Sequence, residues 1–485
     1  DRLRSRGLGD VYKRQVFSSL TFLFAFLPIF LVLYYCSPAK YRNGLLFTGS
    51  LVFYGIGEPL YLCLIICSVL VNLGIGLFID RSERLSGKRL WLITGLLYNF
   101  GLLFFFKYTN FFLENINGVL RLCHSSTQLK LLELTLPLGI SFYTFQIVSY
   151  IVDVYRGKVK ADHSVISLGA YLCMFPQLIA GPIVVYSDIR RELHERTITI
   201  HNLDDGLKTF ILGLGFKVLL ANRVGTLWNE VCTIGFESIS TPLAWLGSLA
   251  YSMQLYFDFC GYSLMAIGLG KMLGFTIPEN FHHPYLSRSV TDFWRRWHIT
   301  LGAWFREYVY IPLGGNRKGR IRTVVNLGIV WLLTGFWHGA AWNFILWGAF
   351  IFLLEILEKN LLLPVLNHKS IAAHIFSHIY MILYILVSWT IFAISDFSQL
   401  AMYLARMFPF FGMGHTLNPY DFVKYLTDYG VLLVCCILFC TAGPEKLYHR
   451  FKNKLGGIAI ALIIFWYSVY YLAIGMNNPF LYFRF

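Results

Sequence analysis

Long apolar runs separated by short basic segments make up most of the chain. Uncharged runs occur at 16–39, 59–79, 90–106, 134–152, 164–187, 238–257, 323–354, 429–444 and 455–483. A further apolar run begins with Lys369 and spans 369–395, and shorter apolar runs lie at 43–57 and 207–222. A helix needs about 20 mostly apolar residues to cross a bilayer, and most of these runs are near that length. The pattern therefore predicts an all-α, polytopic membrane protein with about ten to twelve membrane helices.

Two of the apolar runs contain residues that interrupt a helix. Glu58 and Pro59 divide the stretch 43–79, which predicts a helical hairpin. Pro176 and Pro182 lie inside 164–187, and each proline removes a backbone donor from the helical ladder. Broken backbone at membrane depth needs protein or water around it. This run is interpreted either as an ordinary proline kink or as a re-entrant segment that lines a central site.

Residues 276–322 are the least membrane-like internal stretch, and they carry a helical pattern of aromatic residues. An apolar face with i, i+3, i+4, i+7 spacing is formed by Trp294, Trp297, His298, Leu301, Trp304, Phe305 and Tyr308. Asp292 is a suitable N-cap for this helix, and Pro312 would end it. We expect one amphipathic helix that lies in the membrane interface with its aromatic side inward.

Composition agrees with a membrane protein, because 56% of the residues are hydrophobic and only 14% are charged. A soluble chain carries roughly 25% charged residues. The net charge is +15, and the basic residues cluster between apolar runs. This is typical of cytoplasmic loops that meet anionic lipid headgroups, so no nucleic-acid partner is predicted. The basic turn 317–322 is predicted to be cytoplasmic, where Arg317 and Lys318 would also attract an anionic donor.

A single membrane domain is predicted over residues 16–485, because no linker, low-complexity block or internal repeat divides it. Residues 1–15 are polar, with five Lys or Arg and two Asp, and are interpreted as a non-native leader. The ten cysteines include no CxxC pair, and no His/Cys cluster has the spacing of a zinc site. Neither a structural disulfide nor a bound metal is predicted.

His338 is the most unusual polar residue, since it lies inside the uncharged run 323–354. A titratable ring at membrane depth costs free energy unless it faces a polar cavity or a partner. The small residues 339–341 permit close approach, Trp337 offers an aromatic wall, and Asn343 can bond a carbonyl or hold the ring's tautomer. A neutral imidazole here is suited to taking a proton from an alcohol. The alternative is a buried structural histidine.

Three further polar residues are candidates. His298 is expected to share a cavity with His338, or to be structural. Asp258 either orients a histidine or pairs with an arginine in the interior, or it ends a helix at the interface; Asn280 either bonds inside a pocket or forms a turn. No phosphate loop, G-x-S-x-G elbow or Ser/Lys dyad stands at a convincing position. Direct transfer with a histidine base is therefore the most economical mechanism for an enzyme.

The segments DFWRRWHITLGAWFREYVYIPLGGNRKG and TGFWHGAAWNFILWG strongly resemble the membrane-bound O-acyltransferase family, and within it the bacterial alginate O-acetyltransferase type. The likeness extends through VFSSLTFLFAFLPIFLVLYY, FPQLIAGPI, QLYFDFCGYS and NPFLYFRF, and so covers 16–485. The resemblance implies a ring of membrane helices, with re-entrant or interfacial helices, around a central tunnel. It also implies that His298 and His338 are the two catalytic histidines of the family.

The implied reaction moves an acyl group, here acetyl, from a cytosolic thioester to hydroxyls of an extracytoplasmic polysaccharide, either an alginate-like exopolysaccharide or a cell-wall glycan. Acetyl-CoA is the expected donor substrate, and no bound cofactor is expected. A secreted partner of the esterase fold often completes the transfer in this branch. The expected location is the bacterial cytoplasmic membrane, where the chain contacts lipid. The expected substrate-binding residues are Asp258, Asn280, Trp337, Asn343, Arg317 and Lys318.

Two other functions stay open at this point. One is D-alanyl transfer to teichoic acid from a carrier protein; the basic stretch FREYVYIPLGGNRKG fits the acetyltransferase branch better. The other is a polysaccharide transporter without chemistry. Transporters often show inverted repeats and paired charges at the midplane, and the sequence shows no such repeat and few such charges.

Overall fold

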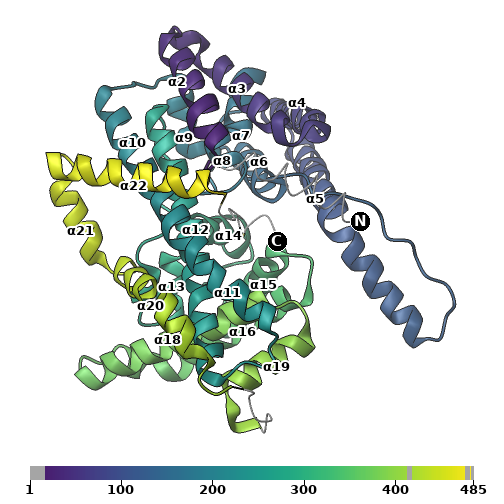
Figure 1. Ribbon diagram of the computed structural model, residues 1–485. Coiled ribbons are helices and arrows are strands. Elements are labelled where there is room, and N and C mark those ends of the chain that lie inside the picture. The colour runs from purple at the N-terminus through teal and green to yellow at the C-terminus, as the bar shows by residue number, and fades with distance from the viewer. Residues whose placement is uncertain (1–16, 412–417, 476–480, 482–485) are drawn as a thin grey trace. The chain divides into compact units, whose positions relative to one another are not determined.

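A computed structural model describes residues 17–411, 418–475 and 481 of the chain, and these residues form helices joined by turns (Figure 1). The predicted all-α class is confirmed. The predicted leader 1–15 lies outside the described residues, as does most of the closing segment NPFLYFRF. The chain forms two compact units, which are Asp1–Leu207 with Ala266–Pro278, and Lys208–Met265 with Glu279–Phe485.

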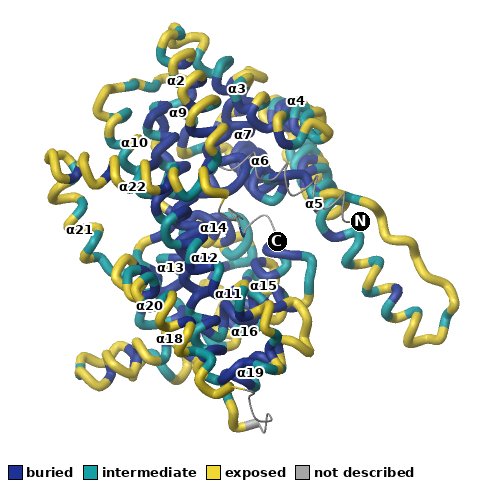
Figure 2. Tube along the Cα trace, viewed as in Figure 1, coloured by how far each residue is buried: buried dark blue, intermediate teal, exposed yellow. Residues whose placement is uncertain are grey.

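The first unit contains the N-terminal helices. Its elements are a π-helical turn η1 (Phe22–Phe26), α2 (Leu27–Cys36), the 3₁₀ turns η2 (Ala39–Tyr41) and η3 (Pro59–Tyr61), α3 (Arg42–Gly57), α4 (Leu62–Arg81), α5 (Leu85–Leu122), α6 (Ile140–Tyr155), α7 (Val165–Cys173), α8 (Phe175–Leu178) and α9 (Tyr186–His194). α6 and α7 are largely buried, whereas much of α5 is exposed (Figure 2). The predicted breaks near Pro59 and Pro176 are both present.

Two helices, α10 (Ile200–Gly215) and α12 (Thr241–Met272), contribute residues to both units. The second unit continues with η4 (Phe216–Ala221), α11 (Asn222–Ile234), η5 (Pro284–Leu286), α13 (Val290–Arg296), α14 (Ile299–Phe305), η6 (Arg306–Tyr310), α15 (Arg320–His338), α16 (Trp342–Leu357), η7 (Glu358–Leu362), α17 (Leu363–Leu366), α18 (Ile371–Ala393), α19 (Phe397–Met407), η8 (Pro409–Phe411), α20 (Asp421–Phe439), α21 (Ala442–Phe451) and α22 (Leu455–Ala473).

Six helical stretches among the described residues are long and apolar enough to cross a bilayer. They are Pro59–Arg81, Leu85–Leu122, Ile200–Ile234, Ile371–Ala393, Asp421–Phe439 and Leu455–Ala473. The chain is thus a multi-pass membrane protein. Several of the other predicted segments are divided into shorter helices, because prolines or small residues interrupt the apolar runs that suggested them.

The run 323–354 is one of these divided segments. α15 ends at His338, residues 339–341 are extended or bent, and α16 then packs against α15. The two helices come very close, since a Cβ added at Gly335 would lie 2.2 Å from the carbonyl oxygen of Phe344. The uncharged run around His338 is therefore not one continuous helix: the residue ends α15 at the tip of a helical hairpin.

The predicted amphipathic helix from residue 292 is also wrong in its bounds. Two short helices, α13 and α14, replace it, and the break falls at Trp297 and His298. Ser289 is the N-cap, because its hydroxyl accepts a hydrogen bond from the backbone N–H of Asp292 at 3.0 Å. The spacing of the aromatic residues fitted one helix because both halves bury aromatic side chains.

Candidate active site

His298 stands at the joint between α13 and α14 and has a left-handed backbone conformation, with φ of 46°. Few residues other than glycine adopt this conformation, and surrounding contacts must hold it. Here a short backbone pairing supplies them on both sides of the histidine. The N–H of His282 donates to the backbone carbonyl of Arg296 at 2.9 Å, and the N–H of Ile299 donates to the backbone carbonyl of Asn280 at 3.0 Å.

The side chain of Asn280 contacts the imidazole of His298 directly. Its Oδ1 lies 3.1 Å from Nδ1 of His298, and both residues are buried. The same oxygen accepts from the backbone N–H of Thr300 at 3.3 Å, and a backbone N–H can only donate. The facing amide atom is therefore the oxygen, and Nδ1 of His298 must carry the ring proton. This tautomer leaves the lone pair on Nε2, the nitrogen that would act as a base.

His298 also lines a cavity of about 480 Å³ within the second unit. Its walls include three indoles, one carboxylate and several cationic groups. Among the lining residues are Trp294, Trp297, Trp331, Thr334, Arg295, Arg306, Glu355 and Lys359. This volume lies in the range of small-molecule sites, roughly 300–1,000 Å³. Burial lowers the pKa of His298, so the ring is neutral at neutral pH.

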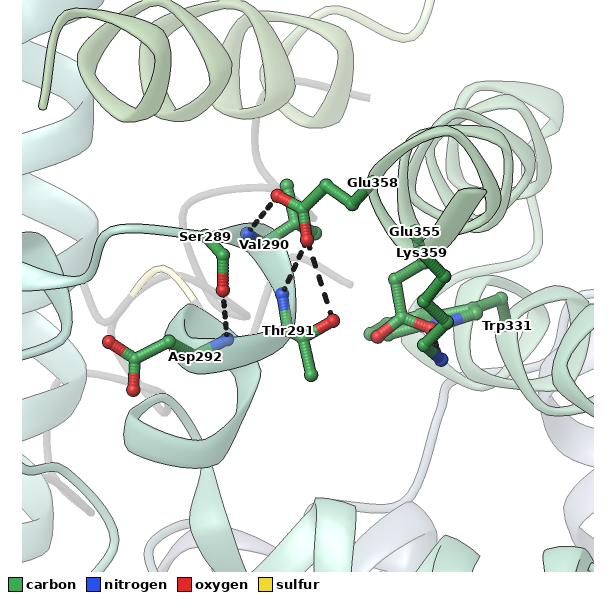
Figure 3. Close-up of polar contacts among 8 residues, drawn as sticks. All are labelled: Ser289, Val290, Thr291, Asp292, Trp331, Glu355, Glu358 and Lys359. Atoms are coloured by element: carbon green, nitrogen blue, oxygen red, sulfur yellow. Dashed lines mark hydrogen bonds and ion pairs between the residues drawn. The ribbon is translucent and has the colours of Figure 1, made fainter. Parts of the chain in front are cut away.

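Glu355 contributes the one carboxylate among the residues that line this cavity. Nε1 of Trp331 donates to it at 3.2 Å, and Nζ of Lys359 lies 3.4 Å from the same oxygen (Figure 3). The indole and the ammonium together compensate the buried charge. Since Arg295 and Arg306 also line the cavity, its charged groups are on balance cationic.

His338 is buried at the end of α15, and its imidazole is surrounded by aromatic rings. Its centroid lies 5.1 Å from that of Trp347 and 5.2 Å from that of Phe392. The cavity wall includes Thr334, one turn before His338, but His338 itself is not among the lining residues. The two histidines nevertheless share a neighbour, because the Trp337 ring lies 6.1 Å from His298 and 5.0 Å from His338.

A chain of indole contacts joins the two histidine-bearing segments. The Trp297 ring lies 4.8 Å from Trp389, which lies 5.9 Å from Trp347, the neighbour of His338. Sequence reasoning missed Trp389. It lies in the apolar stretch that forms α18, where a single tryptophan gives no sign of the partners it meets.

Asp258 is buried within α12 and pairs with Lys217 at 2.5 Å. Its other oxygen accepts from the backbone N–H of Leu481 at 2.8 Å, and Nζ of Lys217 also donates to Asn222 at 2.9 Å. The expected interior position is therefore confirmed, but the partner is a lysine and not a histidine or arginine, and the alternative of a helix-end position is wrong. An interior ion pair thus holds Asp258. The next residue, Phe259, contacts His298, with ring centroids 4.7 Å apart.

The remaining predicted site residues have different surroundings. Nδ2 of Asn343 donates to the carbonyls of Ile391 and Phe392, at 3.3 and 2.9 Å, so Asn343 ties α16 to the end of α18. Arg317 and Lys318 are exposed in the turn before α15. Of the predicted set, the structure brings Asn280 and Trp337 against His298, whereas the contacts of Asn343 are with backbone.

Comparisons with known proteins agree with the resemblance seen in the sequence. Residues 155–366 match the membrane-bound O-acyltransferase family. The chain is 36% identical to a probable alginate O-acetylase of Pseudomonas putida over 97% of this chain and 100% of that protein. It is 41% identical to the Azotobacter vinelandii protein of the same name, over 82% and 78% of the two chains. A peptidoglycan O-acetyltransferase of Helicobacter pylori is 39% identical over 69% and 68%.

Proposed function

Because the chain belongs to the membrane-bound O-acyltransferase family, we propose that this O-acyltransferase carries acetyl groups from a cytosolic thioester, acetyl-CoA, to hydroxyls of a polysaccharide outside the membrane. The names of its relatives support a polysaccharide acceptor, with alginate-like exopolysaccharide and cell-wall glycan as the two classes. The location that fits such a reaction is the bacterial cytoplasmic membrane.

The observation that carries the proposal is the contact between Asn280 and His298 at the wall of a cavity. A hydroxyl is a weak nucleophile until a base takes its proton. Asn280 holds the His298 proton on Nδ1, so Nε2 is ready to accept one. A base positioned in this way typically contributes ~10²–10⁴-fold to the rate.

The proposed step balances without any further reactant. Nε2 of His298 takes the hydroxyl proton while the acceptor oxygen attacks the thioester carbonyl, and a C–O bond forms. The C–S bond then breaks, and the leaving thiolate takes the proton from the imidazolium. The products are the acetyl ester and the free thiol, and His298 returns to its neutral form.

Cationic groups around the cavity support an anionic donor. Arg295, Arg306 and Lys359 line it, and Arg317 and Lys318 are exposed in the turn that the sequence predicts to be cytoplasmic. Guanidinium and ammonium groups bind phosphate well. We therefore propose that the phosphates of the donor meet these side chains while its thioester reaches His298.

His338 remains the second proposed catalytic histidine. The sequence favours it as the base, whereas the cavity wall supports His298 in that role. Since Trp337 contacts both rings, the two histidines belong to one aromatic cluster.

A secreted partner of the esterase fold is proposed to complete the transfer to polymer where the acceptor does not itself reach the cavity.

The purified protein, incubated with acetyl-labelled acetyl-CoA and an alginate or peptidoglycan acceptor, tests the proposal. Label is expected to leave the donor and appear as base-labile ester, and His298→Ala is expected to abolish the transfer. D-alanyl transfer is tested in parallel with the charged carrier protein as donor. The proposal is overturned if the wild-type protein moves D-alanyl and not acetyl, or if His298→Ala transfers acetyl normally.

A further inference from the structure

A second buried carboxylate lies one turn beyond Glu355, at the start of η7. Glu358 is fully buried, and its two oxygens point to the first residues of α13 (Figure 3). Oε1 accepts from the N–H of Val290 at 2.5 Å, and Oε2 accepts from the N–H of Thr291 at 3.3 Å. One side chain, distant in sequence, thus satisfies two backbone donors at the start of this helix.

α13 depends on such support because it is only seven residues long. Helices this short are not stable alone, and the first N–H groups of any helix lack partners within it. Ser289 satisfies the N–H of Asp292, and Glu358 satisfies the two N–H groups before it. A carboxylate in this position is favoured both by charge-assisted hydrogen bonds and by the helix dipole.

The other end of α13 leads directly to the candidate base. The helix ends at Arg296, and His298 follows two residues later with its left-handed backbone. Arg296 and Trp297 pair with residues 281–282, beside Asn280. A rigid two-turn helix therefore connects the carboxylate of Glu358 to the imidazole. Displacement by ~1 Å at a reacting centre can cost 10²-fold in rate.

We propose that Glu358 is a positioning residue, which holds α13 so that His298 keeps its place at the cavity wall. This inference rests on the proposed function. Glu358 is not itself among the residues that line the cavity, unlike Glu355, and both of its oxygens face α13. It acts through the helix and not on the reacting atoms.

The test compares Glu358→Gln with wild type and with Glu230→Gln. Glu230 is a matched control because it is a partly buried carboxylate of the same unit, bonded to Tyr429 at 2.7 Å and not to α13. In Glu358→Gln an NH₂ group replaces one acceptor oxygen. It then faces a backbone N–H of α13, so two donors meet and one hydrogen bond is lost. We expect kcat for acetyl transfer to fall at least tenfold, with the KM for acetyl-CoA within twofold of wild type. Glu230→Gln is expected to match wild type in both.

The pH dependence of kcat separates positioning from general destabilisation. If α13 shifts, His298 gains contact with water, and the acid limb of the profile moves toward the ordinary histidine value of about 6.5. A variant that is merely less folded shows a lower profile with an unmoved limb, and that result overturns the proposal. Wild-type kcat in Glu358→Gln overturns it as well.

A second variant is available if Glu358→Gln does not fold. Val290→Pro removes the N–H that donates to Oε1 of Glu358 and replaces the buried Val290 side chain with a proline ring, at the first helical position, where proline is tolerated. It is expected to lower kcat and to move the acid limb in the same direction, and wild-type behaviour in this variant overturns the proposal. The two hypotheses fail separately: no acetyl transfer by the wild-type protein refutes the function, whereas normal transfer by Glu358→Gln, or by Val290→Pro where Glu358→Gln does not fold, refutes only the role of Glu358.

Discussion

The side-chain oxygen of Asn280 accepts the Nδ1 proton of His298 at 3.1 Å, and its Nδ2 donates to the hydroxyl of Ser263 at 3.2 Å. The amide is therefore held from both ends, and it in turn holds the imidazole in one tautomer. A carboxylate at residue 280 can still accept the Nδ1 proton with one oxygen. Its other oxygen can accept a hydrogen bond from Ser263, because a hydroxyl can donate as well as accept. A methyl group can do neither.

We accordingly expect Asn280→Asp to keep most of the acetyl-transfer activity. Asn280→Ala should lower kcat by about 10- to 100-fold, which is part of the total that a positioned base supplies. Steady-state transfer from labelled acetyl-CoA measures both. Asn117→Ala is the control. Asn117 and its hydrogen-bond partner, the backbone of Leu129, both lie in the first unit, whereas Asn280 lies in the second. Equal activity of the Ala and Asp variants at residue 280 would contradict this role.

The pH dependence of transfer follows from the burial of His298, which lowers its pKa. A base works in its unprotonated form, so transfer should stay constant as pH falls through the ordinary histidine value of about 6.5. Folding stability, by contrast, should decrease in this pH range, because below that value the unfolded chain binds a proton that the folded protein does not. Unfolding therefore becomes easier as pH falls further. An acid limb centred near 6.5 in the wild-type profile would argue against His298 as the buried base.

His338→Phe separates chemistry from packing at the tip of the α15–α16 hairpin. Phenylalanine retains an aromatic ring against Trp347 and Phe392 but has no basic nitrogen. If His338 is catalytic, transfer should fall by ~10²–10⁴-fold while the melting temperature in detergent stays near that of wild type. Normal transfer in this variant would leave His338 as a packing residue only.

The buried pair of Lys217 and Asp258 is expected to matter for stability more than for chemistry. Loss of one partner leaves an uncompensated buried charge, which costs about 3–5 kcal/mol, whereas loss of both is often nearly neutral. Lys217→Met and Asp258→Leu should each lower the melting temperature strongly, and the double variant should recover it together with acetyl transfer. A stable double variant without transfer would instead make Asp258 a substrate-binding residue.

Close packing of α15 against α16 gives a prediction about glycine. A Cβ at Gly335 would lie 2.2 Å from a backbone oxygen of α16, and one at Gly348 would lie 2.4 Å from the oxygen of Trp331. Alanine at either residue should force the helices apart and lower both thermal stability and transfer, because backbone cannot yield cheaply. Gly101→Ala is the control, since nothing lies within 4 Å of the added atom, and it should be neutral.

Much of the architecture follows from the apolar pattern. A helix satisfies the backbone hydrogen bonds of a continuous apolar segment within lipid, so the all-α class could be predicted from the sequence alone. Proline and glycine marked the breaks near Pro59 and Pro176 correctly for the same local reason. The two histidines stood out because polar rings are rare in such sequence.

Tertiary structure alone decided which of these residues meet. The break at His298 depends on backbone pairing with residues 280–282, and the periodicity of the aromatic residues concealed it. Lys217 and Asp258 are far apart in the chain, as are Glu358 and Val290, and no local pattern records either contact. Helical propensity and hydropathy act over a few neighbouring residues, whereas a site is made by long-range packing, so the sequence by itself determined the kind of protein and its candidate histidines but not their partners.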